Sequence, residues 1–358
     1  MIQESQSIYY LVYSLGCLAI GITYLKIKST EEVTSTTNEF KLFQSGFVTG
    51  YCIMILGEII STACFFHTFL YLQLSVEQIT KLYVVTIVST TSFGILGEII
   101  DIGSRKSKCM LSSLLYGISL GSVFFGGHYD MLLIGRVLFG AASAIHHSAF
   151  DAYIIYEHNT HGFPEEWLSQ TFTQLTHSMA LVAVLSGALG QTAGVSSPLG
   201  AASLACAVFA LGGLYILATW SRDSLSAPRF LLGAFLQQAG QATQAVRSSR
   251  ALQLYLGVTS LSEAAVTVFS FYWAPWLFSV VTVRAGHVLP FEIVFACFVV
   301  ASMQGAYMLQ IAGGGDAAFH GLLLAAAGAF LLGSLFQTPA MAFLISLVRA
   351  TSLPHRHC

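Results

Sequence analysis

The sequence predicts an all-α protein that crosses a membrane many times. Charged residues make up 9% of its 358 residues and hydrophobic residues 55%, and its mean hydropathy is +0.72. A water-soluble globule of this composition would lack the polar surface that it needs. The apolar residues also gather in segments of about 20, the length that a helix needs to cross a bilayer core of about 30 Å.

Ten such segments are predicted to be membrane-spanning helices, and a shorter apolar stretch, 338–348, follows them. The ten are 8–26, 44–66, 79–100, 109–127, 131–156, 168–190, 198–219, 251–278, 291–311 and 318–336. A further segment, 230–246, is predicted to be an amphipathic helix that lies on the cytosolic surface.

The basic residues orient these helices. If the N-terminus lies outside the cell, twelve of the 15 Lys and Arg residues fall on the cytosolic side, as the positive-inside rule requires. Lys81 and Arg284 fall outside, and Arg136 lies within a span. The leader MIQESQS carries no basic residue, so the first helix is predicted to be a lasting anchor and not a cleaved signal peptide.

Two hydrophilic breaks, 27–43 and 220–250, divide the chain. The predicted parts are an anchor helix with its cytosolic linker (1–43), a six-helix transporter half (44–219), a cytosolic central loop (220–250) and a partial second half (251–358). Only about three and a half spans follow residue 250, which predicts an incomplete second half, as a truncated gene product would have.

Composition also excludes several classes of function. A net charge of −2 gives no electrostatic footprint for nucleic acid. The seven cysteines are widely and irregularly spaced without a CxxC pair, which argues against a structural metal and a disulfide framework. No HExxH, GxSxG or Walker loop is present. We therefore predict no enzyme, no cofactor and no metal.

Three sequence motifs carry a family resemblance. Gly97, Asp101, Arg105 and Lys106 match the spacing of the cytosolic loop signature GxxxD(R/K)xGR(R/K) of the major facilitator superfamily, although Ile102 and Ser104 depart from it. Residues 135–140, GRVLFG, resemble the RxxxG signature of the superfamily. The segments SAFDA at 148–152, EH at 157–158 and FPEEW at 163–167 resemble its eukaryotic molybdate-anion transporter branch.

The resemblance covers roughly residues 1–310. It implies a major facilitator fold with an extra N-terminal helix, and a secondary transporter that takes up a small oxyanion, most specifically molybdate, across the plasma membrane. The partners implied are the oxyanion, the lipid bilayer and coupling protons. Molybdate, sulfate and tungstate are all tetrahedral dianions, and no residue pattern separates them.

The helix predicted at 131–156 carries one polar stripe. At about 100° per residue, Arg136, Gly140, His147 and Asp151 fall within one arc, whereas His146 points some 80–100° away and is predicted to be structural. A charge that faces lipid near the bilayer centre costs at least about 2.5–3.5 kcal/mol, so the stripe should face the interior of the bundle. For Arg136 the alternative is a structural role, as an ion pair or as a clamp on backbone carbonyls. For His147 the alternative is a hydrogen bond within the helix packing.

The candidate site residues follow from this stripe and its neighbours. Donors for the oxyanion are expected from side chains on helices 131–156 and 168–190, namely Arg136, His147, Ser148, Gln174 and His177. Proton-coupling or structural acids are expected at Glu58, Asp151 and Glu263. Gly97, Asp101, Arg105 and Lys106 are the predicted cytosolic gating motif.

Two other functions compete with transport. His146 and Asp151 satisfy the HxxxxD pattern of glycerolipid acyltransferases, but they lie inside an apolar span and not at an accessible surface. A transport-inactive relative that acts as a sensor or binding partner is the second alternative, and the incomplete second half favours it.

Overall fold

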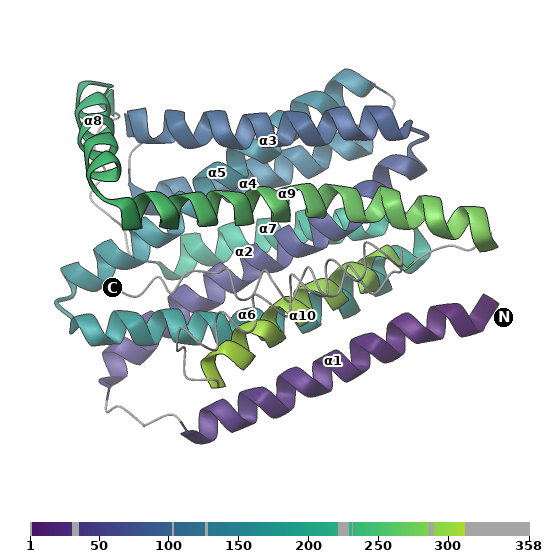
Figure 1. Ribbon diagram of the computed structural model, residues 1–358, viewed down its shortest axis with the longest axis horizontal. Coiled ribbons are helices and arrows are strands. Elements are labelled where there is room, and N and C mark those ends of the chain that lie inside the picture. Colours follow the sequence, from purple (N-terminus) through teal and green to yellow (C-terminus); the bar gives the residue numbers. More distant parts are fainter. Residues whose placement is uncertain are drawn as a thin grey trace.

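The protein is a bundle of long helices, as Figure 1 shows for the computed structural model. Residues 2–30, 36–101, 104–125, 128–220, 229–230, 232–285 and 290–311 are described. The helices are α1 (Ile2–Thr30), α2 (Asn38–Tyr71), α3 (Val76–Ile99), α4 (Arg105–Gly121), α5 (Tyr129–Thr160), α6 (Glu165–Ser196), α7 (Pro198–Thr219), α8 (Leu232–Ser248), α9 (Arg250–Ala285) and α10 (Phe291–Ile311), with a 3-10 turn, η1 (Ser122–Phe125), after α4. The predicted span 318–336 and the stretch 338–348 lie outside the described residues.

The first nine predicted spans are all helices. The bounds of 198–219 and 291–311 agree with those of α7 and α10. Helix α4 begins earlier than predicted and ends earlier, at Gly121, where η1 follows it, and the other helices are longer than predicted. Two early starts are explained by caps that lie before the apolar core: the Thr37 side chain accepts a hydrogen bond from the Phe40 amide at the start of α2, and the Ser104 side chain accepts one from the Ser107 amide at the start of α4.

Eight of the described helices are long and apolar enough to cross a membrane. Helix α5 falls outside this set because its polar residues lower its hydropathy, yet it packs against both α3 and α4. Gly140 permits the contact with α3, since a Cβ at this position would lie 2.6 Å from the Thr86 carbonyl oxygen. The prediction of a polar helix inside the bundle is therefore in line with its packing.

Helices α2, α4, α5, α6 and α7 contribute to one hydrophobic core, which includes Phe47, Tyr116, Phe150, Phe209 and Trp220. Its largest side chains come from α2, α4, α5 and α7, and α3 packs against α5. Together these six helices are the ones predicted to form the first transporter half. The exact domain boundaries stay predictions.

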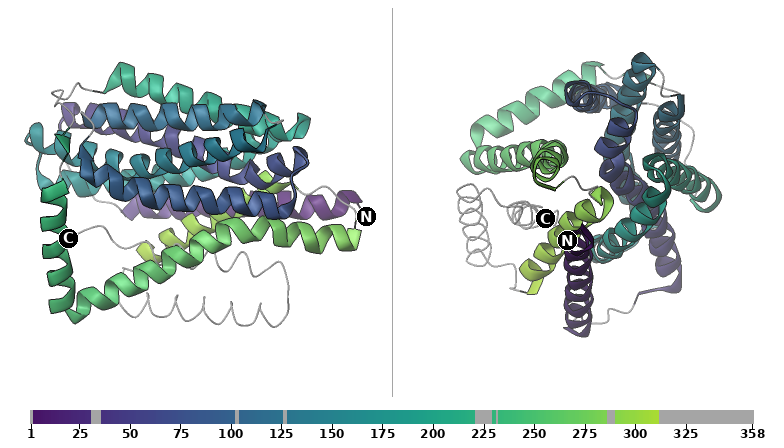
Figure 2. Two further views of the ribbon diagram at one scale, coloured as in Figure 1. Left: turned by 90° about the horizontal axis from the view of Figure 1, so that it is seen from above. Right: turned by 90° about the vertical axis from the view of Figure 1, so that its right-hand side faces the viewer.

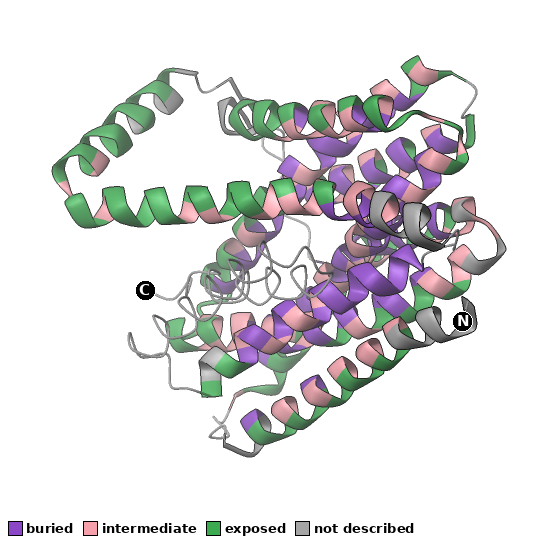
Figure 3. Ribbon diagram, turned by 45° about the vertical axis from the view of Figure 1, so that its right-hand side comes forward, coloured by how far each residue is buried: buried purple, intermediate pink, exposed green. Residues whose placement is uncertain are grey.

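The extra helix α1 lies along α10 and touches α6 (Figure 1). Tyr13 donates a hydrogen bond to the Val184 carbonyl of α6, and the Thr23 hydroxyl contacts Gln304 of α10 at 3.2 Å. The opposite face is a stripe of exposed leucines and isoleucines suited to lipid, Leu11, Leu15, Leu18, Ile22 and Leu25. Exposed positions along this face and along α9 appear in Figure 3.

We call the end of the bundle where α1 begins the outer end, and the end where α8 lies the inner end, in keeping with the predicted orientation (Figure 2). Helix α9 packs on the bundle toward the outer end, where Trp273, Ala274 and Leu277 are buried, and diverges from it toward α8. At the outer end a second hydrophobic cluster joins α9 and α10 to α2 and α3.

A short antiparallel pair of strands links two loops at the inner end. In it β1 (Ile100–Asp101) pairs with β2 (Arg229–Phe230), and Asp101 lies opposite Arg229. The loop after α3 is thereby tied to the predicted central loop. Helix α8 confirms the helix predicted at 230–246, two residues further along the chain.

Candidate functional site

Glu58 of α2 faces two histidines of α5 in the middle of the bundle. Its Oε1 lies 3.6 Å from Nε2 of His147, and its Oε2 lies 3.9 Å from Nε2 of His146. Glu58 is 21% exposed, His147 60% and His146 1%. The cluster therefore has a buried side and an open side, which a small polar ligand would need.

Aromatic rings frame this cluster. Tyr51 of α2 stacks on His146 with 5.7 Å between ring centroids, and Tyr116 of α4 meets the same ring edge-on at 6.2 Å. Neither ring nitrogen of His146 has a hydrogen-bond partner among the described residues. Sequence analysis set His146 apart from the polar stripe, but its ring turns toward the same carboxylate as that of His147.

Arg136 lies at a different level of α5. Its guanidinium group is enclosed by the rings of Phe65, Phe69 and Phe139, whose centroids are 4.9, 5.2 and 4.8 Å from the guanidinium carbon, and the residue is 5% exposed. Eleven positions separate it from His147, a rise of about 16 Å along the helix. One tetrahedral anion cannot touch both side chains, so the stripe provides two separate positions.

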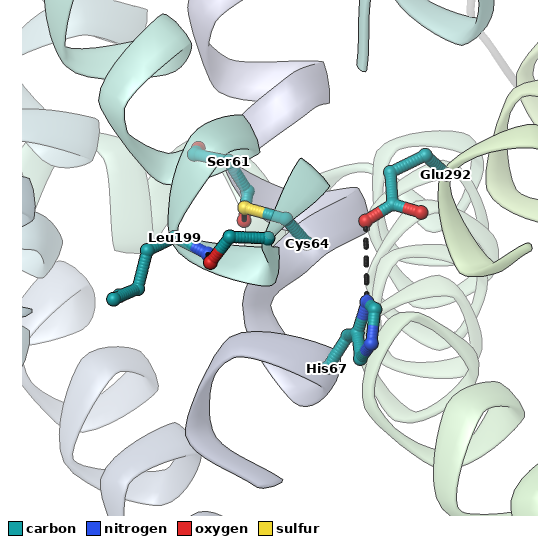
Figure 4. A network of polar contacts seen from close by, with 6 residues as sticks. Ser61, Cys64, His67, Leu199 and Glu292 are labelled. Atoms are coloured by element: carbon teal, nitrogen blue, oxygen red, sulfur yellow. Dashed lines mark hydrogen bonds and ion pairs between the residues drawn. The ribbon is translucent and has the colours of Figure 1, made fainter. Parts of the chain in front are cut away.

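A polar contact between α2 and α10 was not predicted from the sequence. Nδ1 of His67 on α2 lies 3.4 Å from Oε1 of Glu292 on α10, as Figure 4 shows. The two residues are 225 positions apart. In the sequence each is an ordinary polar residue near a helix end, and only the folded structure shows that they are partners. Cys64 lies on α2 one turn before His67 and is buried, at 1% exposed.

The other predicted donors are placed as follows. Ser148 follows His147 on α5, and its hydroxyl donates to the Ala144 carbonyl at 3.1 Å. Gln174 is exposed on α6. His177 is buried on α6, where its Nδ1 lies 3.2 Å from the Tyr307 hydroxyl and its ring meets Tyr24 edge-on. His177 thus contacts α1 and α10.

Two predicted acids differ in their surroundings. Asp151 is half-buried on α5, one turn after His147. Glu263 is exposed on the part of α9 that diverges from the bundle. No hydrogen bond or ion pair of the Glu263 side chain occurs among the described residues.

The basic residues of the predicted gating motif join three helices at the inner end. Arg105 lies over the ring of Tyr156 on α5, with its guanidinium carbon 4.0 Å from the ring centroid. Lys106 is 7% exposed and donates to the Leu217 and Trp220 carbonyls at the end of α7. The surroundings of Gly97 and of the Asp101 side chain lie outside the part of the structure that is described.

The motif EH…FPEEW forms an aromatic cluster around the start of α2. Phe40 is 1% exposed and packs against Phe163 at 5.2 Å and Trp167 at 4.8 Å between centroids. His158 is 3.0 Å from the Pro164 carbonyl through its Nε2. The motif therefore stabilises the turn between α5 and α6, and the start of α2 packs against this turn.

A hollow of about 250 Å³ opens at the inner end between α2, α5 and α7. Aromatic residues such as Phe47, Tyr153 and Trp220 line it, together with Glu39 and His161. No group of three or more His, Cys, Asp or Glu side chains within the described ranges is arranged to hold a metal. The Glu58 cluster is the strongest candidate for a ligand site, because it combines a carboxylate and two imidazoles with one exposed side.

Comparison with known protein families gives a match over most of the chain. A family profile described as sugar transporters with 12 transmembrane segments matches residues 8–314. Molybdate-anion transporters of Takifugu rubripes and Danio rerio are each 24% identical to it over 85% of this chain and 67% of their own length. The molybdate-anion transporter of Xenopus tropicalis is 28% identical over 59% of this chain and 44% of its own.

Solved transporters share the fold. A mutant form of the nucleoside transporter NupG superposes with a TM-score of 0.61 at 11% identity, and the match covers 87% of this chain and 79% of its own. A D-xylose–proton symporter superposes with a TM-score of 0.53 at 15% identity, over 88% and 80%. The helical transporter fold predicted from the motifs is confirmed.

Proposed function

The chain belongs to the major facilitator family whose profile matches residues 8–314, and we propose that it carries a small oxyanion, molybdate before sulfate or tungstate, by alternating access. The observation that carries the proposal is the similarity over 85% of the chain to relatives named molybdate-anion transporters. The plasma membrane is the proposed location. The family and the fold point to a transporter and not to an enzyme.

We assign oxyanion binding at the middle of the bundle to the cluster of Glu58, His146 and His147. A tetrahedral dianion is held well by charged and neutral N–H donors; a protonated imidazole supplies charged donors, and a neutral imidazole supplies one neutral donor. The Glu58 carboxylate faces the two rings. Protonation of Glu58 removes its negative charge and leaves the imidazoles to the anion.

This exchange gives a reason for proton coupling. Carrying a dianion into a cell against 100 mV costs about 4.6 kcal/mol, so uptake needs compensating positive charge. A proton on Glu58 that enters with the anion supplies part of it. Asp151, one turn from His147, is the second acid in this proposal, and Glu263 of α9 is the third.

We assign the remaining predicted donors to positions along the path from the outer end to the inner end. Arg136, about 16 Å from His147 along α5, meets the anion nearer the outer end. Gln174 is an exposed donor in the inner part of the path, and Ser148, near the middle, becomes a donor to the anion when its hydroxyl turns away from the Ala144 carbonyl. His177 contributes through the contact between α6 and α10.

Uptake of radiolabelled molybdate by cells that express the full chain tests the proposal. We expect saturable uptake above that of control cells, with inhibition by unlabelled molybdate and tungstate. The His147→Ala variant should raise the KM, whereas Thr243→Ala, on the exposed surface of α8, should not. Uptake equal to that of control cells, from protein shown to reach the membrane, would contradict the assignment.

A further inference from the structure

Glu292 is a buried carboxylate at the outer end of α10. It is 3% exposed, and His67 supplies the one polar side-chain contact of its carboxylate among the described residues, at 3.4 Å (Figure 4). Two glycines of α6 make room for it: a Cβ at Gly194 would lie 3.1 Å from Oε1, and a Cβ at Gly190 would lie 3.5 Å from the Glu292 Cβ. Burying a carboxylate is costly without a partner, so the niche depends on His67.

The contact joins parts of the chain on either side of the central loop. His67 belongs to α2, in the first six-helix bundle, and Glu292 to α10. The ring of Phe291 packs on His67 at 5.3 Å and on Phe66 at 5.9 Å between centroids. Apolar packing and one polar contact therefore close the outer end together.

The inner end differs. Residues 251–265 of α9 are mostly exposed, whereas Trp273, Ala274 and Leu277 near the outer end are buried. Helix α9 leaves the bundle toward α8 (Figure 2). Helix α9 is thus held against the other described helices at the outer end and separated from them at the inner end.

We propose that His67 and Glu292 form a clasp that keeps the outer end closed and that separates whenever the transporter opens outward. For a path to open at this end, α10 must move away from α2, and the clasp is the polar contact that this movement breaks. The inference rests on the alternating access proposed above. It does not depend on which oxyanion is carried.

Cys64 provides a natural reporter of this opening. It lies on α2 one turn before His67 and is 1% exposed. Cys109 is a matched reporter of general unfolding, because it is also fully buried but lies at the start of α4 near the inner end. A reagent that cannot cross membranes should distinguish the two.

The experiment uses two versions of the full chain, in which either Cys64 or Cys109 is the sole cysteine. Each is expressed in cells as parent, Glu292→Gln and His67→Ala, and a membrane-impermeant maleimide is added outside. We expect the maleimide to react with Cys64 about tenfold faster in both variants than in the parent. This is the factor that corresponds to the loss of one hydrogen bond to a charged group. Cys109 should stay unlabelled in all of them.

A matched control separates a general loss of packing on α10 from loss of the clasp. Thr23→Val removes the contact of α1 with Gln304, at 3.2 Å, and should leave Cys64 labelling at the parental rate. Parental labelling of Cys64 in Glu292→Gln would overturn the proposal, and so would a parallel rise at Cys109. Faster Cys64 labelling without any molybdate uptake would retain the clasp and reject the proposed substrate.

Discussion

The Nζ atom of Lys106 lies 2.5 Å from the carbonyl oxygen of Trp220, just past the last turn of α7. The last carbonyls of a helix have no partner within it and carry the negative end of its dipole, so a buried ammonium group satisfies both needs. The Leu217 carbonyl accepts a second bond from Lys106, at 3.0 Å. A basic residue of the predicted gating motif thus fastens α4 to α7.

Replacing Lys106 by Met should destabilise the protein, because Met keeps the apolar stem and loses two charge-assisted hydrogen bonds. The expected loss is about 1.5–3 kcal/mol, seen as a fall of several degrees in the melting temperature of purified protein. Lys81→Met is the matched control, since the Lys81–Glu77 pair is 63% and 78% exposed and such pairs contribute little. Equal melting temperatures for the two variants would remove the structural role of Lys106.

Replacing His146 by Phe should raise the melting temperature and lower transport. The ring is buried, stacks on Tyr51 and leaves both nitrogens without a hydrogen bond among the described residues, which is unfavourable for a polar group. His147→Phe, at a position 60% exposed, should change the melting temperature little. A lower melting temperature for His146→Phe would mean that its contact with Glu58 stabilises the fold.

Replacing Gly140 by Ala should reduce the amount of folded protein, because the new methyl group would lie 2.6 Å from both the Thr86 carbonyl oxygen and the Ser89 Cβ. Overpacking of this kind costs about 1–3 kcal/mol. Gly117→Ala on α4 is the control, since no atom lies within 4 Å of its added Cβ, and it should be neutral or slightly stabilising. Fluorescence-detected gel filtration compares the two.

Uptake of molybdate should accelerate as the external pH falls, because protons that reach Glu58 neutralise the carboxylate facing His146 and His147. Glu58→Gln should flatten this dependence, since an amide cannot take up and release a proton. Initial rates measured over a range of external pH decide the matter. A flat profile in the parent would reject proton coupling, and an unchanged slope in Glu58→Gln would exclude that residue.

The orientation is tested by labelling from outside. In a cysteine-free background, Glu77→Cys at the exposed start of α3 should react in intact cells, and Thr243→Cys on α8 only after the membrane is permeabilised. The reason is the excess of Lys and Arg in the loops at the end of the bundle where α8 lies. The opposite result would reverse the outer and inner ends.

Much of the fold could be predicted because it depends on local sequence. Length and apolarity locate α7 and α10 to the residue, and the cap residues Thr37 and Ser104 explain why α2 and α4 begin earlier than their apolar cores. The helix at 131–156 was predicted from the length of its apolar segment, and it is the long helix whose polar residues lower its hydropathy most. Residues 312–358, with the last predicted span, lie outside the described part.

The site was less predictable because it depends on pairing in space. Helical periodicity separates His146 from His147 by about 100°, yet Glu58 lies between the directions of the two rings and is reached from both. The same periodicity places Arg136 and His147 on one face of the helix, but the rise of about 16 Å between them puts them too far apart to share one anion. Nothing local marks His67 and Glu292 as partners, since the contact exists only once α10 packs against α2 and α6.

The docking of α1 on α10 has a consequence for how the protein is made. Helix α1 packs mainly on α10, from which a long stretch of sequence separates it: Gly16 receives Val300, and the Tyr9 carbonyl contacts Cys297. Its contact with α6 is smaller. During synthesis α1 therefore has only this smaller contact until α10 has entered the bilayer, so most of its packing forms after the helices of the six-helix bundle have met.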